Sequence, residues 1–190
     1  MLVEVVLLIN GRKEKEKYFA ASFKANLPNS SSIALPSNAI FMLDVSLSSH
    51  PDKFNVWLKT LKSVLSNNQG QIKTFNVLMF NIENFWFKPS PVENNTKTIE
   101  EFLRYADQLL LEGASDFNGA IGEINNKYKT SSSAVFILSD GAVTWGEDDT
   151  RLLANSISRT HKVFTFNTGM EGSDNQLLKD VAQKNGGNCI

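Results

Sequence analysis

"AIFMLDVSLSSHPDKF", residues 39–54, begins as a continuous apolar run, stops on Asp44 and then offers Ser46, Ser48 and Ser49. A continuous apolar run of this length is typical of a strand that is covered on both faces of a parallel sheet. Two interpretations fit the polar end of the stretch. Asp and Ser cap helices and start turns, or their oxygens bind a hard metal ion. A metal ion needs further ligands from elsewhere in the chain, so the two interpretations can be separated.

Helix and strand patterns alternate after this stretch. An apolar stripe from Phe54 to Leu65 predicts a helix with Pro51 in its first turn, where a missing N–H is harmless. A capping box at residues 98–101 predicts a second helix, whose apolar positions run on to Leu110. The other expected elements are strands at 72–81, 84–88, 134–140 and 162–169, and helices at 116–128, 147–157 and from a cap at 173–176 to Gly186-Gly187.

This alternation predicts an α/β fold: a doubly wound, mostly parallel central sheet flanked by helices, over residues 36–190. The short strand at 84–88 is expected to be an antiparallel partner of its predecessor. Residues 1–35 look different, because they predict an N-terminal β-hairpin joined at Asn10-Gly11. A Pro, Ser and Asn cluster at residues 27–38 then predicts a linker. In the helix at 116–128, Gly119 and Gly122 suggest a close backbone approach.

The composition excludes several classes of function. The chain of 190 residues is 42% hydrophobic and 21% charged, which is typical of a globular protein. Lys and Arg number 19 against 20 Asp and Glu, so no nucleic acid or anionic membrane is expected as a partner. No apolar run is long enough for membrane insertion. The single cysteine, Cys189, excludes an internal disulfide and a cysteine-rich zinc site.

Further oxygen ligands are available where the metal interpretation needs them. Asp140 ends the apolar run "AVFILSD", and Ser115 stands at the start of a predicted helix. Ligands in open α/β sheets bind at the carboxyl ends of the strands, so Asp44 and Asp140 are expected at the same edge. The candidate ligands are Asp44, Ser46, Ser48, Ser115 and Asp140. Such oxygen ligands select Mg²⁺ or Mn²⁺, with Ca²⁺ as an alternative, and leave positions open for an external oxygen.

Three ordered motifs, "DVSLS" (44–48), "GASD" (113–116) and "ILSDGAVTWGE" (137–147), resemble the von Willebrand factor type A domain. The first is similar to the Asp-x-Ser-x-Ser signature of its metal-ion-dependent adhesion site (MIDAS). The closest likeness is to the branch found in inter-alpha-trypsin inhibitor heavy chains, where the A domain follows a small β domain known as VIT. Residues 1–35 look like the end of such a segment. The resemblance covers about residues 39–190, including the ending "LLKDVAQKNGGNC".

The resemblance implies a role for each candidate ligand. Ser46 and Ser48 would bind the metal directly, Ser115 replaces the family's usual Thr, and Asp44 and Asp140 would act through waters or directly. Two residues depart from the pattern. Leu47 stands where close relatives often carry Gly, which would stiffen or shield the loop. Ser115 keeps the hydroxyl and lacks the methyl that helps to fix its rotamer.

The expected function is that of a divalent-cation-dependent protein-binding module, in which the open metal position accepts an Asp or Glu of a partner. The resemblance favours the cell surface or secretion, with intracellular members known, and a place in a longer multidomain chain. A Mg²⁺-dependent hydrolase or phosphotransferase with Asp44 as nucleophile is an alternative. No second acid stands two residues after Asp44, and no general base can be named. The expectation is therefore that the protein is not an enzyme. A structural domain with a vestigial metal site is the third hypothesis.

Three further expectations concern single residues. Trp145 has two open interpretations, an exposed anchor for a partner or a packed side chain. His50 lies next to the proposed site but is not favoured as a ligand, because a hard cation prefers oxygen. Substitution of Asp44 or Asp140 by alanine is predicted to abolish Mg²⁺ and Mn²⁺ binding without unfolding the domain.

Overall fold

The structure, a computed structural model, describes residues 2–13, 16–26 and 36–190. The chain divides into two compact units, residues 1–34 and residues 35–190. The predicted linker at 27–38 lies mostly outside the described residues. Within the described ranges, no helix is both long and apolar enough to cross a bilayer.

The first unit contains two strands that pair as expected for a hairpin. Strands β1 (Leu2–Lys13) and β2 (Glu16–Asn26) pair antiparallel. The prediction that Asn10-Gly11 joins them is wrong, because both residues lie inside β1 and pair with residues of β2. The ladder continues to the last residue of β1, and this longer register adds backbone pairs that a turn at Asn10-Gly11 would forgo.

The second unit is built on a six-stranded sheet. Its strands are β3 (Asn38–Asp44), β4 (Thr74–Phe80), β5 (Asn84–Trp86), β6 (Val92–Glu93), β7 (Ala134–Leu138) and β8 (Lys162–Thr165). The order is β5-β4-β3-β7-β8, and β6 also pairs with β4. β3, β4, β7 and β8 are parallel, whereas β5 and β6 run antiparallel to β4. The prediction of a mostly parallel sheet with a short antiparallel partner is confirmed.

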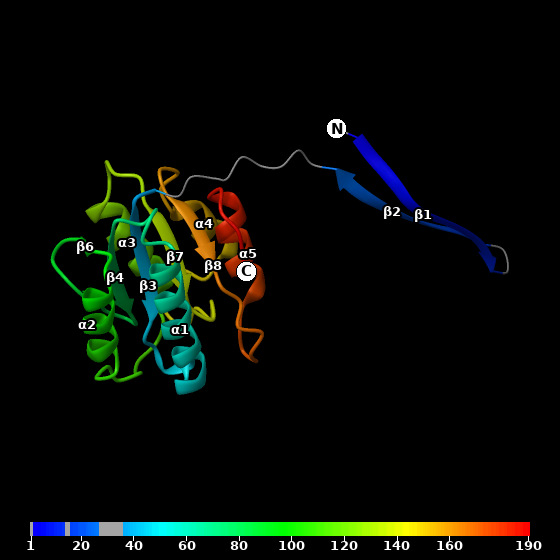
Figure 1. The fold of residues 1–190 in the computed structure, drawn as a ribbon. Coiled ribbons are helices and arrows are strands. Elements are labelled where there is room, and N and C mark those ends of the chain that lie inside the picture. The colour runs from blue at the N-terminus through cyan, green and yellow to red at the C-terminus, as the bar shows by residue number, and fades with distance from the viewer. Residues whose placement is uncertain (1, 14–15, 27–35) are drawn as a thin grey trace. The chain divides into compact units, whose positions relative to one another are not determined.

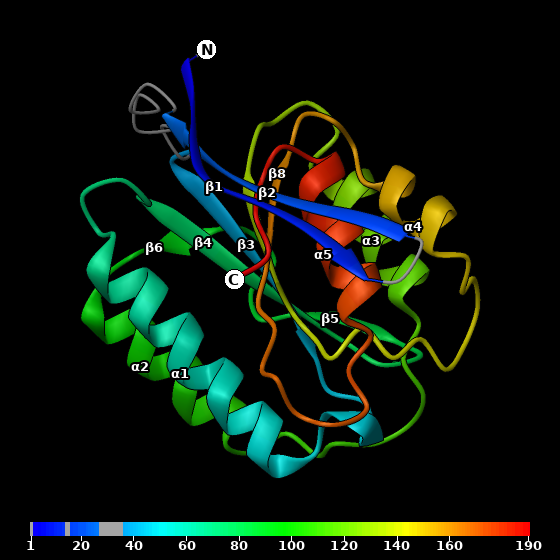
Figure 2. The same ribbon diagram turned by 90° about the vertical axis from the view of Figure 1, so that its right-hand side faces the viewer.

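Helices cover both faces of this sheet. They are the 3₁₀ turn η1 (Leu47–Ser49), α1 (Pro51–Asn67), α2 (Thr96–Ala106), α3 (Phe117–Lys127), α4 (Thr150–Ser156) and α5 (Asn175–Lys184). Figures 1 and 2 show α1 and α2 on one face and α3, α4 and α5 on the other. Each face has its own apolar core, because residues of β3 and β7 alternate between the two clusters. The doubly wound α/β architecture follows from this two-sided covering.

The apolar runs of the sequence account for these elements. Every residue of β7, and every residue of β3 after Asn38, is buried, as expected for central strands of a parallel sheet. The predicted stripe of α1 faces the sheet with Trp57 and Leu61 fully buried, and Pro51 occupies the first turn. The start and stripe of α1 are therefore confirmed.

The second helix begins and ends earlier than predicted. Its N-cap is Asn95, whose side-chain oxygen accepts a hydrogen bond from the Thr98 backbone N–H at 3.0 Å. The predicted capping box starting at Thr98 is therefore wrong, because the side-chain oxygen of Asn95 already accepts a free N–H of the first turn. The helix ends at Ala106, so Leu109 and Leu110, predicted as helical, belong to the segment that follows.

The two glycines of α3 have different surroundings. A Cβ on Gly119 would lie 2.6 Å from the carboxylate of Asp116, which caps this helix by accepting the Gly119 N–H. Gly119 therefore leaves room for the cap. A Cβ on Gly122 would meet nothing within 4 Å, so the close approach predicted there is wrong.

The end of the chain packs against the edge strand β8. The N-cap of α5 is Asp174, one residue after the predicted Ser173, and the helix stops before Gly186 and Gly187 as expected. Gly186 has a φ of +69°. Beyond the glycines, Cys189 forms a parallel bridge with Thr165, which extends the sheet beside β8.

Candidate metal centre

The candidate ligands lie at the carboxyl edge of the sheet. Asp44 is the last residue of β3, and Asp140 follows β7 by two residues. Leu43 pairs with Leu138, so the two strands end side by side and deliver both carboxylates to one edge. Ser115 immediately precedes Asp116, the N-cap of α3. In the order β5-β4-β3-β7-β8, β4 follows β3 on one side and β7 lies on its other side, so the ends of β3 and β7 flank the switch point where open α/β sheets bind ligands.

Asp44 is the centre of a hydrogen-bond network and is fully buried. Its Oδ1 accepts the backbone N–H of Ser46 at 2.9 Å and the hydroxyl of Ser49 at 3.0 Å. Its Oδ2 accepts the hydroxyl of Ser139 at 2.7 Å and that of Ser115 at 3.3 Å. Both oxygens are thus occupied by donors, which suits a carboxylate that acts on an ion through water.

The hydroxyls of Ser46 and Ser48 lie next to each other, with their Oγ atoms 3.0 Å apart. Ser46 is buried and Ser48 is half-buried. The backbone N–H of Leu47 donates to Gly113 O at 3.0 Å, which ties this loop to the segment that carries Ser115. This backbone bond therefore holds residues 46–48, the hydroxyl loop, against the segment that leads into α3.

Asp140 forms a buried ion pair with Lys53. The Lys53 Nζ lies 2.7 Å from Asp140 Oδ2, and it also donates to the backbone oxygen of Ser48 at 3.3 Å. The other carboxylate oxygen of Asp140 accepts the Ala142 N–H at 3.0 Å. The ammonium of Lys53 thus bridges the second carboxylate and the hydroxyl loop.

Burial raises the pKa of the Asp44 carboxyl above its ordinary value. Hydrogen bonds from Ser46 and Ser139 lower this pKa, while the negative charge of Asp140 raises it further. Ionised Asp44 is therefore costly to bury, and positive charge nearby reduces that cost.

All of the predicted ligands lie in this cluster, linked by the contacts just described. The sequence interpretation noted Ser49 without giving it a role, and it missed Ser139 and Lys53. Lys53 could have been found, because it lies four residues before Trp57 on the buried stripe of α1. Ser139 adjoins Asp140, but its bond to Asp44 depends on strand register, which the sequence does not reveal.

The donor set fits a hard cation. It offers carboxylate and hydroxyl oxygens, which suit Mg²⁺ or Mn²⁺ better than zinc. Across the described residues, no group of three or more His, Cys, Asp or Glu side chains could hold a metal, so the serine hydroxyls are essential to any such site. The ammonium of Lys53 does not suit an oxygen site for a cation, because it is itself positively charged.

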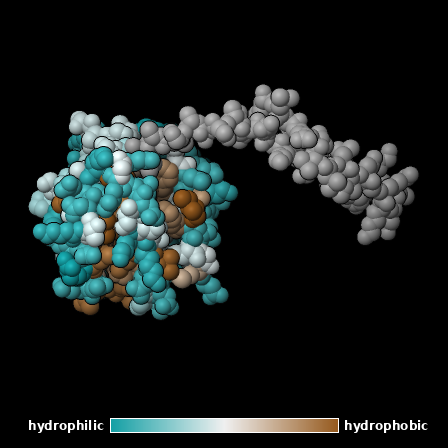
Figure 3. Space-filling view, viewed as in Figure 1, coloured by the Kyte–Doolittle hydropathy of each residue, from teal (hydrophilic) through white to brown (hydrophobic). Residues whose placement is uncertain are grey.

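Two residues with exposed apolar side chains adjoin the oxygen cluster through the backbone. Leu47 is 70% exposed and Trp145 is 63% exposed, and the backbone N–H of Trp145 donates to the backbone oxygen of Ser115. The interpretation of Trp145 as a packed residue is therefore wrong. Figure 3 shows hydrophobic patches on an otherwise mostly hydrophilic face.

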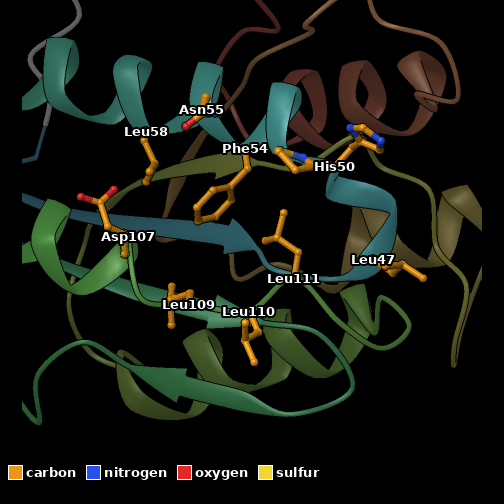
Figure 4. Close-up of a pocket in the computed structure, with 11 residues that line it drawn as sticks. Leu47, His50, Phe54, Asn55, Leu58, Asp107, Leu109, Leu110 and Leu111 are labelled. Atoms are coloured by element: carbon orange, nitrogen blue, oxygen red, sulfur yellow. The ribbon is translucent and has the colours of Figure 1, made fainter.

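A pocket of about 540 Å³ adjoins the cluster between the start of α1 and the segment after α2. Figure 4 shows Phe54 and Leu58 on α1 opposite Leu109 and Leu111, with Leu47 at one end. Leu47 thus lines this pocket next to the candidate ligands Ser46 and Ser48.

His161 lies just before β8 and is fully buried. In the described part of the chain, neither of its ring nitrogens has a hydrogen-bond partner. Burial lowers the pKa of His161 below its ordinary value, because a charged imidazole would be desolvated. The unfolded chain therefore binds this proton more readily, and stability is predicted to fall as the pH drops below about 6.5.

Urea unfolding at pH 7.5 and pH 5.5 measures this effect. The His161→Leu variant is expected to lose less stability than the wild type between these pH values. The His50→Ala variant removes the exposed histidine and should retain the wild-type loss. Equal losses for the wild type and His161→Leu would show that His161 does not cause the acid sensitivity.

Several known proteins resemble this chain in sequence or in fold. No family model matches the chain. Mouse inter-alpha-trypsin inhibitor heavy chain 4 is 24% identical over 188 residues, which is 91% of this chain and 19% of the mouse protein. The manganese-loaded TRAP protein of Plasmodium vivax has a TM-score of 0.61 at 11% identity, covering 79% of this chain and 63% of that chain. A von Willebrand factor type A structure from Catenulispora acidiphila has a TM-score of 0.55 at 11% identity, covering 82% and 38%.

The fold is that of the von Willebrand factor type A domains, and the part of the chain after the hairpin adopts it. The resemblance predicted from the three motifs is thereby confirmed, with an inter-alpha-trypsin inhibitor heavy chain as a curated relative. The chain spans about a fifth of the length of that relative.

Proposed function

We propose that this domain is a protein-binding module that works through a divalent cation. The observation that supports it best is the cluster of Asp44, Ser46, Ser48, Ser115 and Asp140 at one edge of the sheet. In the proposed site the hydroxyls of Ser46, Ser48 and Ser115 and the two carboxylates hold Mg²⁺ or Mn²⁺. The cation supplies an open position for an external oxygen.

The surroundings of the cluster favour binding over catalysis. Leu47 and Trp145 are exposed beside the oxygens, and exposed aromatic side chains are frequent anchors in interfaces. Asp44 accepts hydrogen bonds at both carboxylate oxygens, which leaves it poorly placed as a nucleophile. We therefore propose a partner that presents an Asp or Glu to the cation, and not a hydrolase or phosphotransferase.

Similar proteins support proposals on the metal ion, the location and the larger chain of this domain. The Plasmodium vivax TRAP structure is manganese-loaded, which supports a divalent cation in a domain of this fold. The likeness to an inter-alpha-trypsin inhibitor heavy chain supports a place at the cell surface or outside the cell, as part of a longer multidomain chain. Residues 1–35 are proposed to be the end of a VIT-like β segment.

A second candidate function is a structural domain with a vestigial metal site. The buried ion pair between Lys53 and Asp140 favours it, because an ammonium already neutralises one of the carboxylates. The two candidates differ in whether the wild-type protein binds a divalent cation at all.

Titration calorimetry with MnCl₂ on the wild-type chain separates them. The protein-binding module predicts saturable heat in the wild type and its loss in Asp44→Ala, with unchanged circular dichroism. Asp52→Ala is the control, since it removes an exposed carboxylate in the first turn of α1 and should leave binding intact. Absence of binding by the wild type would favour the vestigial site.

Water-proton relaxation tests the open position. Bound Mn²⁺ that keeps exchangeable waters enhances the relaxation rate, and added acetate, as a probe carboxylate, is expected to reduce that enhancement. An enhancement that acetate does not change would argue against capture of an acidic side chain. Turnover of a generic phosphate ester that disappears in Asp44→Ala would instead support the enzyme.

A further inference from the structure

Lys53 places an ammonium group inside the cluster of oxygen ligands. The side chain of Lys53 is 10% exposed and that of Asp140 is 0% exposed, with 2.7 Å between Nζ and Oδ2. Lysine is rarely buried to this extent unless it is paired, and here the pair lies at the end of β7. The same ammonium donates to the backbone oxygen of Ser48 in the hydroxyl loop.

The ammonium changes the charge that a metal ion would meet. Asp44 and Asp140 together carry two negative charges when ionised, and Lys53 compensates one of them. A divalent cation that approaches Asp140 is repelled by the ammonium. In addition, Asp140 Oδ2 already accepts a hydrogen bond from that ammonium. Lys53 and a divalent cation therefore compete for the same carboxylate.

Gly172 lies beside the ammonium of Lys53. A Cβ on Gly172 would lie 3.8 Å from the Lys53 Nζ, and the absence of a side chain there leaves space beside the ammonium. The flexible four-carbon stem of lysine can carry the ammonium toward water while its methylenes stay packed. Exchange of the ammonium for a metal ion thus requires a side-chain movement and no change of fold.

We propose that Lys53 is the resident cation of this site, which a divalent ion must displace from Asp140, so that Lys53 sets the affinity for the metal. This inference rests on the proposed metal site. In the metal-free protein the ammonium holds Asp140 and the Ser48 loop together. In the metal-bound protein the ammonium lies in solvent, and Asp140 faces the ion.

Calorimetric titration with MnCl₂ tests this inference with four proteins. Lys53→Met removes the competing charge and is expected to bind Mn²⁺ about tenfold or more tightly than the wild type. Lys53→Arg retains the charge and is expected to remain at the wild-type affinity or below. Lys59→Met removes an exposed lysine of the same helix and should match the wild type.

Thermal unfolding provides a second readout. In EDTA, Lys53→Met is expected to unfold at a lower temperature than the wild type, because Asp140 is then buried without its cation. Added Mn²⁺ should raise the unfolding temperature of Lys53→Met more than that of the wild type. Lys53→Gln, which keeps a hydrogen-bond donor, replaces Lys53→Met if the latter fails to fold.

Each outcome has one meaning. Tighter binding by Lys53→Met supports the inference, and it does so even if the wild type binds no metal, in which case the proposed function fails alone. Equal or weaker binding by Lys53→Met, with measurable binding by the wild type, overturns the inference and leaves the proposed function intact. If no variant binds Mn²⁺, both are overturned.

Discussion

Asp140→Ala is expected to lower the free energy of unfolding by about 3–5 kcal/mol in metal-free buffer, because it leaves the Lys53 ammonium buried without its carboxylate. The expected loss is near the lower limit if the lysine side chain reaches water. The acceptor of the Ala142 N–H is lost as well. The sequence predicts that this substitution does not unfold the domain, and the ion pair adds the expectation that the folded domain is less stable.

Urea unfolding in EDTA measures the effect, and the double variant Lys53→Met, Asp140→Ala is its control. Removing both charges leaves neither one buried alone, so the double variant is expected to be more stable than Asp140→Ala. A loss below about 1 kcal/mol for Asp140→Ala would mean that the pair behaves as an exposed salt bridge.

Gly187→Ala is expected to cost about 3 kcal/mol or more of stability, because the new Cβ would collide with backbone atoms. At an ideal position this Cβ lies 1.7 Å from the carbonyl oxygen of Val163 and 2.6 Å from its carbon. Val163 belongs to β8, so neither partner can move without disturbing the strand and the bridge between Thr165 and Cys189.

Gly122→Ala is the matched control, because it adds the same methyl in open space within α3. Alanine is the better helix former, so this variant is expected to gain about 0.5–1 kcal/mol. Thermal unfolding of both variants measures the contrast. A wild-type unfolding temperature for Gly187→Ala would mean that the segment after α5 does not pack on β8 in solution.

The sequence predicted the sheet and the edge at which its polar residues meet, because long apolar runs and strand ends are local features. The sequence did not predict which face of the sheet the carboxylates of Asp44 and Asp140 contact. β3 is buried on both faces, so its sequence lacks the alternation that would orient Asp44. The pairing of Leu43 with Leu138 places Ser139 beside Asp44, and this register is a tertiary property.

Local signals were less reliable where two of them competed. Asn10-Gly11 is a strong turn signal, yet the pairing of β1 with β2 continues through it. Thr98 fitted a capping box, but Asn95 lies one turn earlier and caps the helix first. Lys53 was hidden for another reason, since a lysine on a helix is usually exposed and only its place on the buried stripe indicated otherwise.

The carboxylates of Asp44 and Asp140 contact elements on opposite faces of the sheet. Asp44 bonds to Ser115 at the start of α3, whereas Asp140 pairs with Lys53 on α1. These helices belong to different layers of the domain (Figure 2). The Asp140–Lys53 ion pair therefore connects the carboxyl end of β7 to the α1 layer. The proposed exchange of Lys53 for a divalent cation would release that connection, so the seating of α1 on the sheet would change with the state of the site.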